Sequence, residues 1–374
     1  MKEKVYIMLL LLCMVAGCSQ NKDKKETNTK MPDNMEQEES DSKVEGAEYS
    51  FPDKFEKKSG NVSFQTQIIV NNISKKNIFY KGTAKCIQID VEKLKERLFE
   101  DIDEEVESHV MESTNYVGEK GEIKIWQTAS NRTLYSSNVN ISYTTPLYTH
   151  INQAFTLPER ENEDTGYSTT KGFEGFTRKQ AWNEIKRILG IQIPEEYICY
   201  TLPFQEMEKR EIVFDLNGNE DISAKKTDWN ENDDTYFFVF RNRYCGLPTY
   251  HPFCYTLNKD ILENMPLQVA ISRKGIEYIS LERIFEYETE NEMIELVPFE
   301  KIAEALEIQL TSILGDQTYT VKSAELKAME RLTGQDSYEM VPIWIIRVET
   351  NDSGETYQFQ KIFDASTAKE LILS

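Results

Sequence analysis

The sequence predicts an α+β fold in which antiparallel sheets each pack with a helix. Strand-like segments follow one another across short turns, two segments have the caps and apolar spacing of helices, and no regular alternation of strand and helix is present. The 374 residues exceed one average domain, and 39% hydrophobic residues suffice for packed cores. We therefore expect about two folded domains.

The first folded region contains four segments with strand character, at 61–70, 77–91, 121–127 and 138–143. An acidic helix is predicted after the second of them, because apolar residues recur at helical spacing. These residues are Val91, Leu94, Leu98, Ile102, Val106 and Val110. The polar segment 158–172 carries turn residues and has no periodicity. We therefore place an N-terminal α+β domain at 51–165 and a C-terminal α+β domain at 172–374.

The C-terminal domain is expected to begin with a helix that starts after Thr177 and stops at Gly190. Gln180 stands three residues after Thr177, as in a capping box, and glycine is the usual residue just past a helix end. The dipeptide Asn217-Gly218 predicts a hairpin, because it tolerates a type I′ turn. Further strands are predicted at 234–244, 267–281 and 282–290.

A second helix is predicted over 298–315, with Pro298 in its first turn and Gly315 past its end. Two strands that turn over 351–354 close the chain. Trp344 is expected in the core, because apolar residues flank it on both faces of its strand. Each part of the C-terminal domain thus has a capped helix followed by strands, which suggests two similar modules.

The amino terminus has the layout of a secretory signal, with Lys2 and Lys4 before a short apolar run. That run is shorter than the ~20 apolar residues of a membrane-spanning helix. The sequence Val15-Ala16-Gly17-Cys18 resembles the lipobox of bacterial lipoproteins. The resemblance implies a signal peptide at 1–17, lipid attachment to Cys18 with acyl chains such as palmitate, and residence on the extracytoplasmic face of the cell membrane. The alternative is an ordinary secretory signal with an incidental cysteine.

Residues 18–50 are expected to form a disordered tether, because they contain almost no large apolar residue.

The net charge of −21 argues against nucleic-acid binding, since no basic surface would offset repulsion from phosphates. Three histidines leave little room for a histidine-rich metal site. No recognisable nucleophile, metalloprotease or phosphate-loop motif is present, so we predict no catalytic residues, metal or cofactor.

One loop brings two cysteines and a histidine together in the sequence, as Cys245, His251 and Cys254. These residues, with His150 or another cysteine, can begin a zinc site, but no paired ligand motif is present elsewhere. In an exported protein a Cys245–Cys254 disulfide is favoured over zinc, and two unpaired thiols are an equal alternative. The states of Cys86 and Cys199 stay open.

The segment from Pro298 to Leu373 resembles a PepSY-type module in its alanine-bearing helix and its turn "DASTAKEL", where Ala368 replaces the usual glycine. The strand "VPIWIIRV" is similar to the Pro-x-Trp strand of the YycH/YycI accessory proteins, and the whole layout resembles uncharacterised lipoproteins of Gram-positive gut bacteria. These resemblances imply a non-catalytic, regulatory role with an envelope protein or sensor kinase as partner. The alternative is a solute-binding lipoprotein associated with a transporter, and an enzyme ranks third.

Overall fold

A computed structural model describes most of the chain after residue 50. The described residues are 51–71, 78–114, 120–137, 140–157, 165–250, 252–255, 261–263, 267–282, 284–312, 317–334, 337–352 and 355–371. They form two compact units: unit 1 comprises 84–244 and 248–288, and unit 2 comprises 51–83, 245–247 and 289–374. Both units combine helices with mostly antiparallel sheets, so the predicted α+β class is confirmed.

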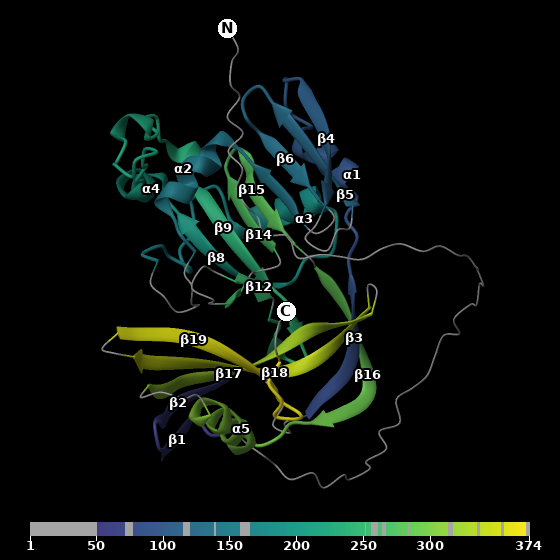
Figure 1. The fold of residues 1–374 in the computed structure, drawn as a ribbon. Helices are drawn as coiled ribbons and strands as arrows, with labels where there is room; N and C mark the ends of the chain where they lie inside the picture. The colour runs from purple at the N-terminus through teal and green to yellow at the C-terminus, as the bar shows by residue number, and fades with distance from the viewer. Residues whose placement is uncertain are drawn as a thin grey trace, which may run out of the picture. The chain divides into compact units, whose positions relative to one another are not determined.

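Unit 1 is built on an eight-stranded sheet (Figure 1). Its spatial order is β4 (Val106–Thr114), β5 (Lys120–Thr128), β6 (Thr133–Ser136), β7 (Ile141–Thr144), β15 (Gly275–Leu281), β14 (Leu267–Ser272), β9 (Thr235–Arg241) and β8 (Glu196–Leu202). Each neighbouring pair is antiparallel. The segment 267–281, predicted as a strand, forms two strands, β14 and β15, which pair as an antiparallel hairpin.

Four helices cover the two faces of this sheet. Helices α1 (Val91–Leu98) and α3 (Arg178–Leu189) bury their apolar residues in one core. Helices α2 (Pro146–Ala154) and α4 (Phe204–Arg210) contribute to a second core on the opposite face. Strand β9 lies between the cores, with Phe238 in the first and Phe237 in the second. A strand that is buried on both faces has a continuous apolar sequence, which explains "YFFVF".

Helix α3 has the end signals that the sequence predicts. The Thr177 side chain accepts a hydrogen bond from the Gln180 backbone N–H, and the Gln180 side chain accepts one from the Thr177 N–H at 2.8 Å. Gly190 ends the helix with a φ of 64°, which is costly for residues that carry a Cβ atom.

Unit 2 contains a seven-stranded sheet, and its strands β3 and β16 each include a point where the chain passes from one unit to the other. Its main order is β1 (Lys54–Ser59), β2 (Val62–Val70), β17 (Thr318–Gly334), β18 (Ser337–Asp352), β3 (Ile78–Cys86) and β16 (Phe285–Glu295), and β19 (Glu355–Asp364) also pairs with β18. Strands β2 and β17 are parallel, and the β17–β18 hairpin is the longest pairing. The closing strands predicted around 351–354 are β18 and β19.

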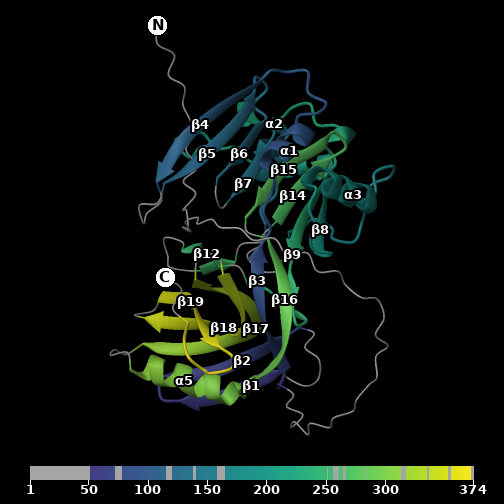
Figure 2. The ribbon, with the colours of Figure 1, turned by 90° about the vertical axis from the view of Figure 1, so that its right-hand side faces the viewer.

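Helix α5 (Phe299–Thr311) lies beside β1 and β2, as Figures 1 and 2 both show. Its buried residues are Phe299, Ile302, Ala303, Leu306 and Leu310. Trp344 on β18 is fully buried, and its ring meets those of Phe51 and Phe299 edge-on at centroid distances of 5.2 and 5.1 Å. The prediction that Trp344 belongs to the core is confirmed.

The short elements lie in the connections. They are the 3₁₀ turns η1 (Ile222–Ala224) and η2 (Glu231–Asp233) and two small hairpins, β10 (Arg243–Tyr244) with β11 (Leu247–Pro248) and β12 (Pro252–Tyr255) with β13 (Ile261–Glu263). In the part of the chain that the structure describes, no helix is long and apolar enough to span a membrane.

Three sequence-based expectations differ from the structure. The acidic helix predicted over 91–110 ends at Leu98, and Val106 and Val110 belong to strand β4. Pairing of β4 with β5 overrides the helical spacing of these two valines. The strands on both sides of 158–172 join one sheet, so the compact units do not divide at the predicted boundary.

The third difference concerns the turn at Asn217-Gly218. Gly218 has a φ of 81°, but Asn217 is not among the residues with positive φ, so the turn is not type I′. A single antiparallel bridge, Phe214 with Glu220, closes it instead of a hairpin ladder.

The order of elements is similar in the two units. Helix α3 precedes β8, β9 and β14, which pair in sequence order, and helix α5 precedes β17, β18 and β19, which do the same. Strands β9 and β18 are the middle strands of these two sets.

Candidate functional site

Unit 1 contains a cavity of about 530 Å³ that is lined mainly by polar residues. The lining residues are Glu104, Ser130, Arg132, Thr145, Pro146, Leu147, His150, Lys225, Lys226, Thr227, Asp228, Asp233, Lys274 and Glu277. Four of them are cationic and four are acidic, in a chain whose net charge is −21. Cations are therefore more concentrated at this cavity than in the chain as a whole.

Three features of the local sequence place side chains at the cavity. Thr145 caps helix α2 and Pro146 begins it, so the amino-terminal end of this helix lies at the cavity. The turn between β14 and β15 supplies Lys274, and the 3₁₀ turn η2 supplies Asp233. Asn230 caps η2 in a capping box with Asp233, which fixes the carboxylate.

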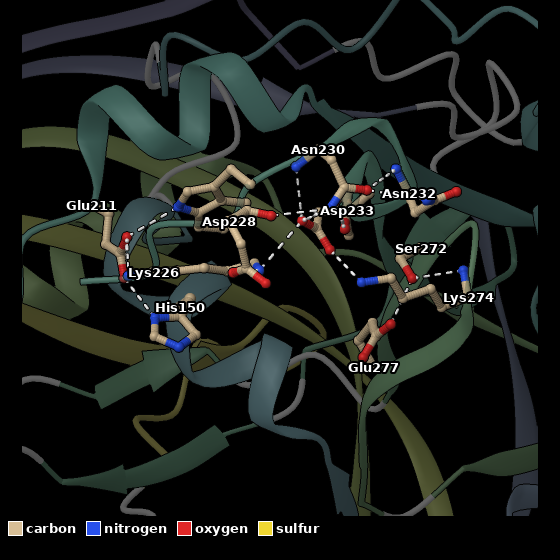
Figure 3. Close-up of polar contacts among 12 residues, drawn as sticks. His150, Glu211, Lys226, Asp228, Asn230, Asn232, Asp233, Ser272, Lys274 and Glu277 are labelled. Carbon is tan, nitrogen blue, oxygen red and sulfur yellow. Dashed lines mark hydrogen bonds and ion pairs between the residues drawn. The ribbon is translucent and has the colours of Figure 1, made fainter. Parts of the chain in front are cut away.

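Glu211 is a buried carboxylate that contacts two of the cavity residues, His150 and Lys226 (Figure 3). Its Oε1 lies 2.6 Å from His150 Nδ1, and its Oε2 accepts hydrogen bonds from Trp229 Nε1 and the Lys226 backbone N–H, both at 3.2 Å. This carboxylate holds the segment after it against helix α2. Its hydrogen-bonding capacity is largely used by the protein.

Asp233 is fully buried and has two lysine partners. Lys274 Nζ donates to its Oδ1 at 2.7 Å, and Lys226 Nζ lies 3.6 Å from its Oδ2. The Asn230 backbone N–H donates to the same Oδ2 at 3.0 Å. These ion pairs and hydrogen bonds offset the free-energy cost of burying the charge of Asp233.

Glu277 is the third buried carboxylate, at 4% exposure. The β14–β15 register skips it between Ile276 and Tyr278, so it occupies a bulge, which redirects a side chain from its regular face. Its Oε1 accepts a hydrogen bond from the Ser272 hydroxyl at 2.5 Å, and its Oε2 accepts one from the Thr145 hydroxyl. No ion pair to Glu277 is present among the described residues.

Two carboxylates at the rim of the cavity, those of Glu104 and Asp228, have pKa values below the usual range. The Ser130 backbone N–H, which donates to Glu104 at 2.8 Å, holds the pKa of Glu104 below its usual value. The hydrogen bond from Lys226 lowers the pKa of Asp228 in the same way. Both groups are therefore anionic at neutral pH, and together with the lysines they give the rim a mixed charge.

An exposed apolar turn lies just before the cavity residues 225–228 in the sequence. We define the apolar turn as residues 212–222, which display Ile212, Phe214, Leu216 and Ile222 to solvent. The turn is ordered by its own polar groups, since Asp215 Oδ1 accepts the backbone N–H groups of Asn217 at 2.8 Å and Asn219 at 2.9 Å. Asp215, Asn217 and Asn219 therefore belong to a turn that is closed by local hydrogen bonds.

The residues singled out from the sequence are distributed as follows. Cys18 and the side chain of Cys254 lie outside the described residues, so the lipid attachment and the Cys245–Cys254 disulfide stay predictions. Cys199 is buried on β8, and burial raises the pKa of its thiol to about 12. His150, which the sequence analysis considers as a zinc ligand, contacts Glu211 instead. Among the described residues no group of three or more His, Cys, Asp or Glu side chains is arranged to hold a metal ion.

The three buried carboxylates are not recognisable as a site in the sequence. Asp233 stands beside Asp234 in the chain, yet the two neighbours have different partners. Asp234 accepts the Phe204 backbone N–H at 3.1 Å, and burial raises its pKa. The local signal at Glu277 is a charged residue within the mostly apolar "GIEYISL" strand.

Comparisons with solved structures relate the chain to bacterial proteins. A crystal structure of an uncharacterised protein from Eubacterium rectale aligns over 86% of this chain and 94% of that protein, with 17% identity and a TM-score of 0.54. The C-terminal domain of Bacillus megaterium YpeB aligns over 76% of this chain and 96% of that domain, with 12% identity and a TM-score of 0.24. No family model and no curated protein matches the chain. The first likeness shows a common fold.

Proposed function

We propose that this chain is a lipid-anchored protein of the extracytoplasmic face of a bacterial cell membrane, and that its folded body binds a protein or peptide without catalysis. The anchor rests on the lipobox-like Val15-Ala16-Gly17-Cys18 and on the signal-like residues before it. A disordered tether of ~30 residues would give the body a reach of roughly 30 Å from the membrane. Partners in the envelope are then within range.

A PepSY-like C-terminal part is supported by the order of α5, β17, β18 and β19 and by the turn that follows β19. In this turn Asp364 Oδ1 accepts the backbone N–H groups of Ser366 at 2.8 Å and Thr367 at 3.1 Å. Ala368 has a φ of 56°, a conformation that favours glycine, the residue usual in the PepSY-type turn. The departure from the family pattern at Ala368 thus leaves the turn geometry intact. A sensor kinase is the partner that the YycH/YycI-like strand favours.

The observation that carries a protein-binding function is the apolar turn. Its four exposed apolar side chains lie within eleven residues, on a turn held rigid by Asp215. Large apolar side chains that gather on a surface are typical of interaction sites, and a rigid loop loses little entropy on binding. The acidic groups of the turn, Asp215, Glu220 and Asp221, would be repelled by anionic lipid. They favour a protein partner with an apolar pocket and a basic rim.

The second candidate function is solute binding for a transporter, and the polar cavity is the observation that favours it. A volume of about 530 Å³ lies in the range of small-ligand pockets. The two functions differ in what reaches the protein, since a transporter-linked protein captures a free solute and needs no envelope protein at the apolar turn.

Photo-crosslinking in the native bacterium separates the two functions. A photoreactive amino acid replaces Leu216 at the tip of the apolar turn, and a control chain carries it at Ile308, an equally apolar, exposed position on α5. We expect one envelope protein to crosslink through position 216 and not through 308, and Phe214→Ser to reduce the yield. Absence of any crosslinked protein, together with saturable binding of a small solute, would overturn the protein-binding function.

A further inference from the structure

We propose that the cavity of unit 1 binds the amino terminus of a peptide, with Glu277 as the acceptor for its ammonium group. This inference rests on the proposed binding function and specifies its ligand chemistry. It starts from the unequal state of the three buried carboxylates around the cavity (Figure 3). The protein supplies most of the hydrogen-bond partners that Glu211 and Asp233 can take. It leaves positions open on Glu277.

Glu211 and Asp233 each have three polar partners within the chain. His150 contacts Glu211 at 2.6 Å, and Lys274 donates to Asp233 at 2.7 Å. Glu277, which lines the cavity, accepts only two hydroxyl hydrogen bonds among the described residues, one on each oxygen. An ionised carboxylate accepts about four hydrogen bonds, so about two positions stay open.

Glu277 lies beside the amino-terminal end of helix α2 but has no ion-pair partner among the described residues. The Thr145 hydroxyl that donates to Glu277 belongs to the cap of helix α2, whose amino-terminal end carries a partial positive charge. Lys274 is only three residues away, yet its Nζ is taken by Asp233. A cation that enters the cavity would therefore find a fixed, partly compensated carboxylate.

Metal ions do not fit this carboxylate, because it is a single acidic group rather than part of a metal-ligand cluster among the described residues. A primary ammonium fits better, since it has three donors for the open positions of Glu277. The lysines and the arginine of the rim can donate to the carbonyl oxygens of a peptide backbone that follows an ammonium group.

The experiment measures retention of tripeptide libraries by the detergent-extracted full chain, read by mass spectrometry. One library has free amino termini and lacks lysine, and the other is acetylated at its amino termini and contains lysine. We expect the first library to be retained and the second to be retained at least about tenfold less, the ratio for one lost charge-assisted hydrogen bond. The pair of libraries thereby separates a terminal ammonium from a lysine side chain.

The matched variants are Glu277→Gln and Glu184→Gln. The amide in Glu277→Gln keeps the size of the side chain and can still bond both hydroxyls, so the fold is preserved, which circular dichroism checks. Glu184 is exposed on α3, on the opposite face of the sheet from α2, and its pairing with Arg187 has no part in the cavity. We expect Glu277→Gln to lower retention about tenfold and Glu184→Gln to leave it unchanged.

Equal retention of the acetylated library, equal retention by Glu277→Gln, or no retention of either library would overturn the inference. Equal retention of both libraries would still support peptide binding. The crosslinking experiment at position 216 does not involve Glu277, so it tests the proposed function whatever the outcome at the cavity.

Discussion

Replacing Trp344 with alanine removes the largest fully buried side chain of the protein. The ring lies between the β18 strand and helix α5, with edge-on contacts to Phe51 and Phe299. Its Nε1 has no hydrogen-bond partner among the described residues. The substitution therefore changes the unfolding free energy of unit 2 in two opposite ways. It removes stabilising apolar burial, and it removes a destabilising unpaired N–H group.

The expected loss of unfolding free energy follows from three contributions. A buried aromatic side chain covers about 200 Å², which corresponds to about 5 kcal/mol. The two edge-on ring contacts add about 1–2 kcal/mol in total. Removing a buried, unpaired N–H group relieves about 1–3 kcal/mol. The net loss is about 3–6 kcal/mol, which overlaps the range of about 3–5 kcal/mol for large aromatic side chains that are truncated in cores.

Urea unfolding followed by far-UV circular dichroism measures this loss. Trp344→Phe is the matched control, because it keeps most of the ring and removes the unpaired N–H group, and we expect it to change stability by less than about 1 kcal/mol. The fluorescence of Trp126, Trp182 and Trp229 reports unit 1 separately in both variants.

A loss below about 1 kcal/mol for Trp344→Ala would refute the burial argument. A fully folded alanine variant that fails to bind its partner would instead identify Trp344 as part of an interaction surface.

Four further outcomes are expected. Cys18→Ala blocks lipid attachment and signal cleavage, and an unmodified amino terminus at another residue, seen by mass spectrometry, would contradict this. Cys199, whose thiol pKa burial raises to about 12, resists alkylation at about pH 8 until the protein unfolds. Ala368→Gly raises the unfolding free energy by about 0.5–1 kcal/mol, because the left-handed conformation costs alanine more than glycine, and an unchanged urea midpoint would contradict it. Non-reducing peptide mapping of protein made under oxidising conditions finds Cys245 joined to Cys254, and recovery of two alkylatable thiols would reject the pair.

Elements with local signals could be predicted from the sequence. Helix α3 has its capping residues and Gly190 within its own segment, and the β14–β15 hairpin has two apolar runs around a short turn. The helix predicted over 91–110 is partly wrong because its last two apolar residues, Val106 and Val110, belong to an edge strand whose partner β5 lies beyond a turn. Spacing alone cannot distinguish such a strand from the end of an amphipathic helix.

The cavity and the buried carboxylates around it could not be predicted, because long-range pairing brings these residues together. Glu211 follows helix α4, Asp233 belongs to η2, and Glu277 lies on β15, so each comes from a different connection or strand. The chain has 64 acidic residues, and nothing in the sequence distinguishes the few that are buried. Burial is decided by the sheet register, and at Glu277 by a bulge that a regular alternation pattern would not include.

These carboxylates are all buried, and they differ in how far partners within the fold offset their charge. A structural carboxylate such as Asp233 is expected to find its cations within the fold, because leaving it unpaired would cost roughly 3–5 kcal/mol by analogy with broken buried pairs. Glu277 is also buried but depends on two hydroxyls and a helix end. If this position were purely structural, glutamine or an apolar residue would fill it more easily than a glutamate. A buried carboxylate that stays incompletely paired at the surface of a cavity is therefore better explained by a cation that comes from outside the chain.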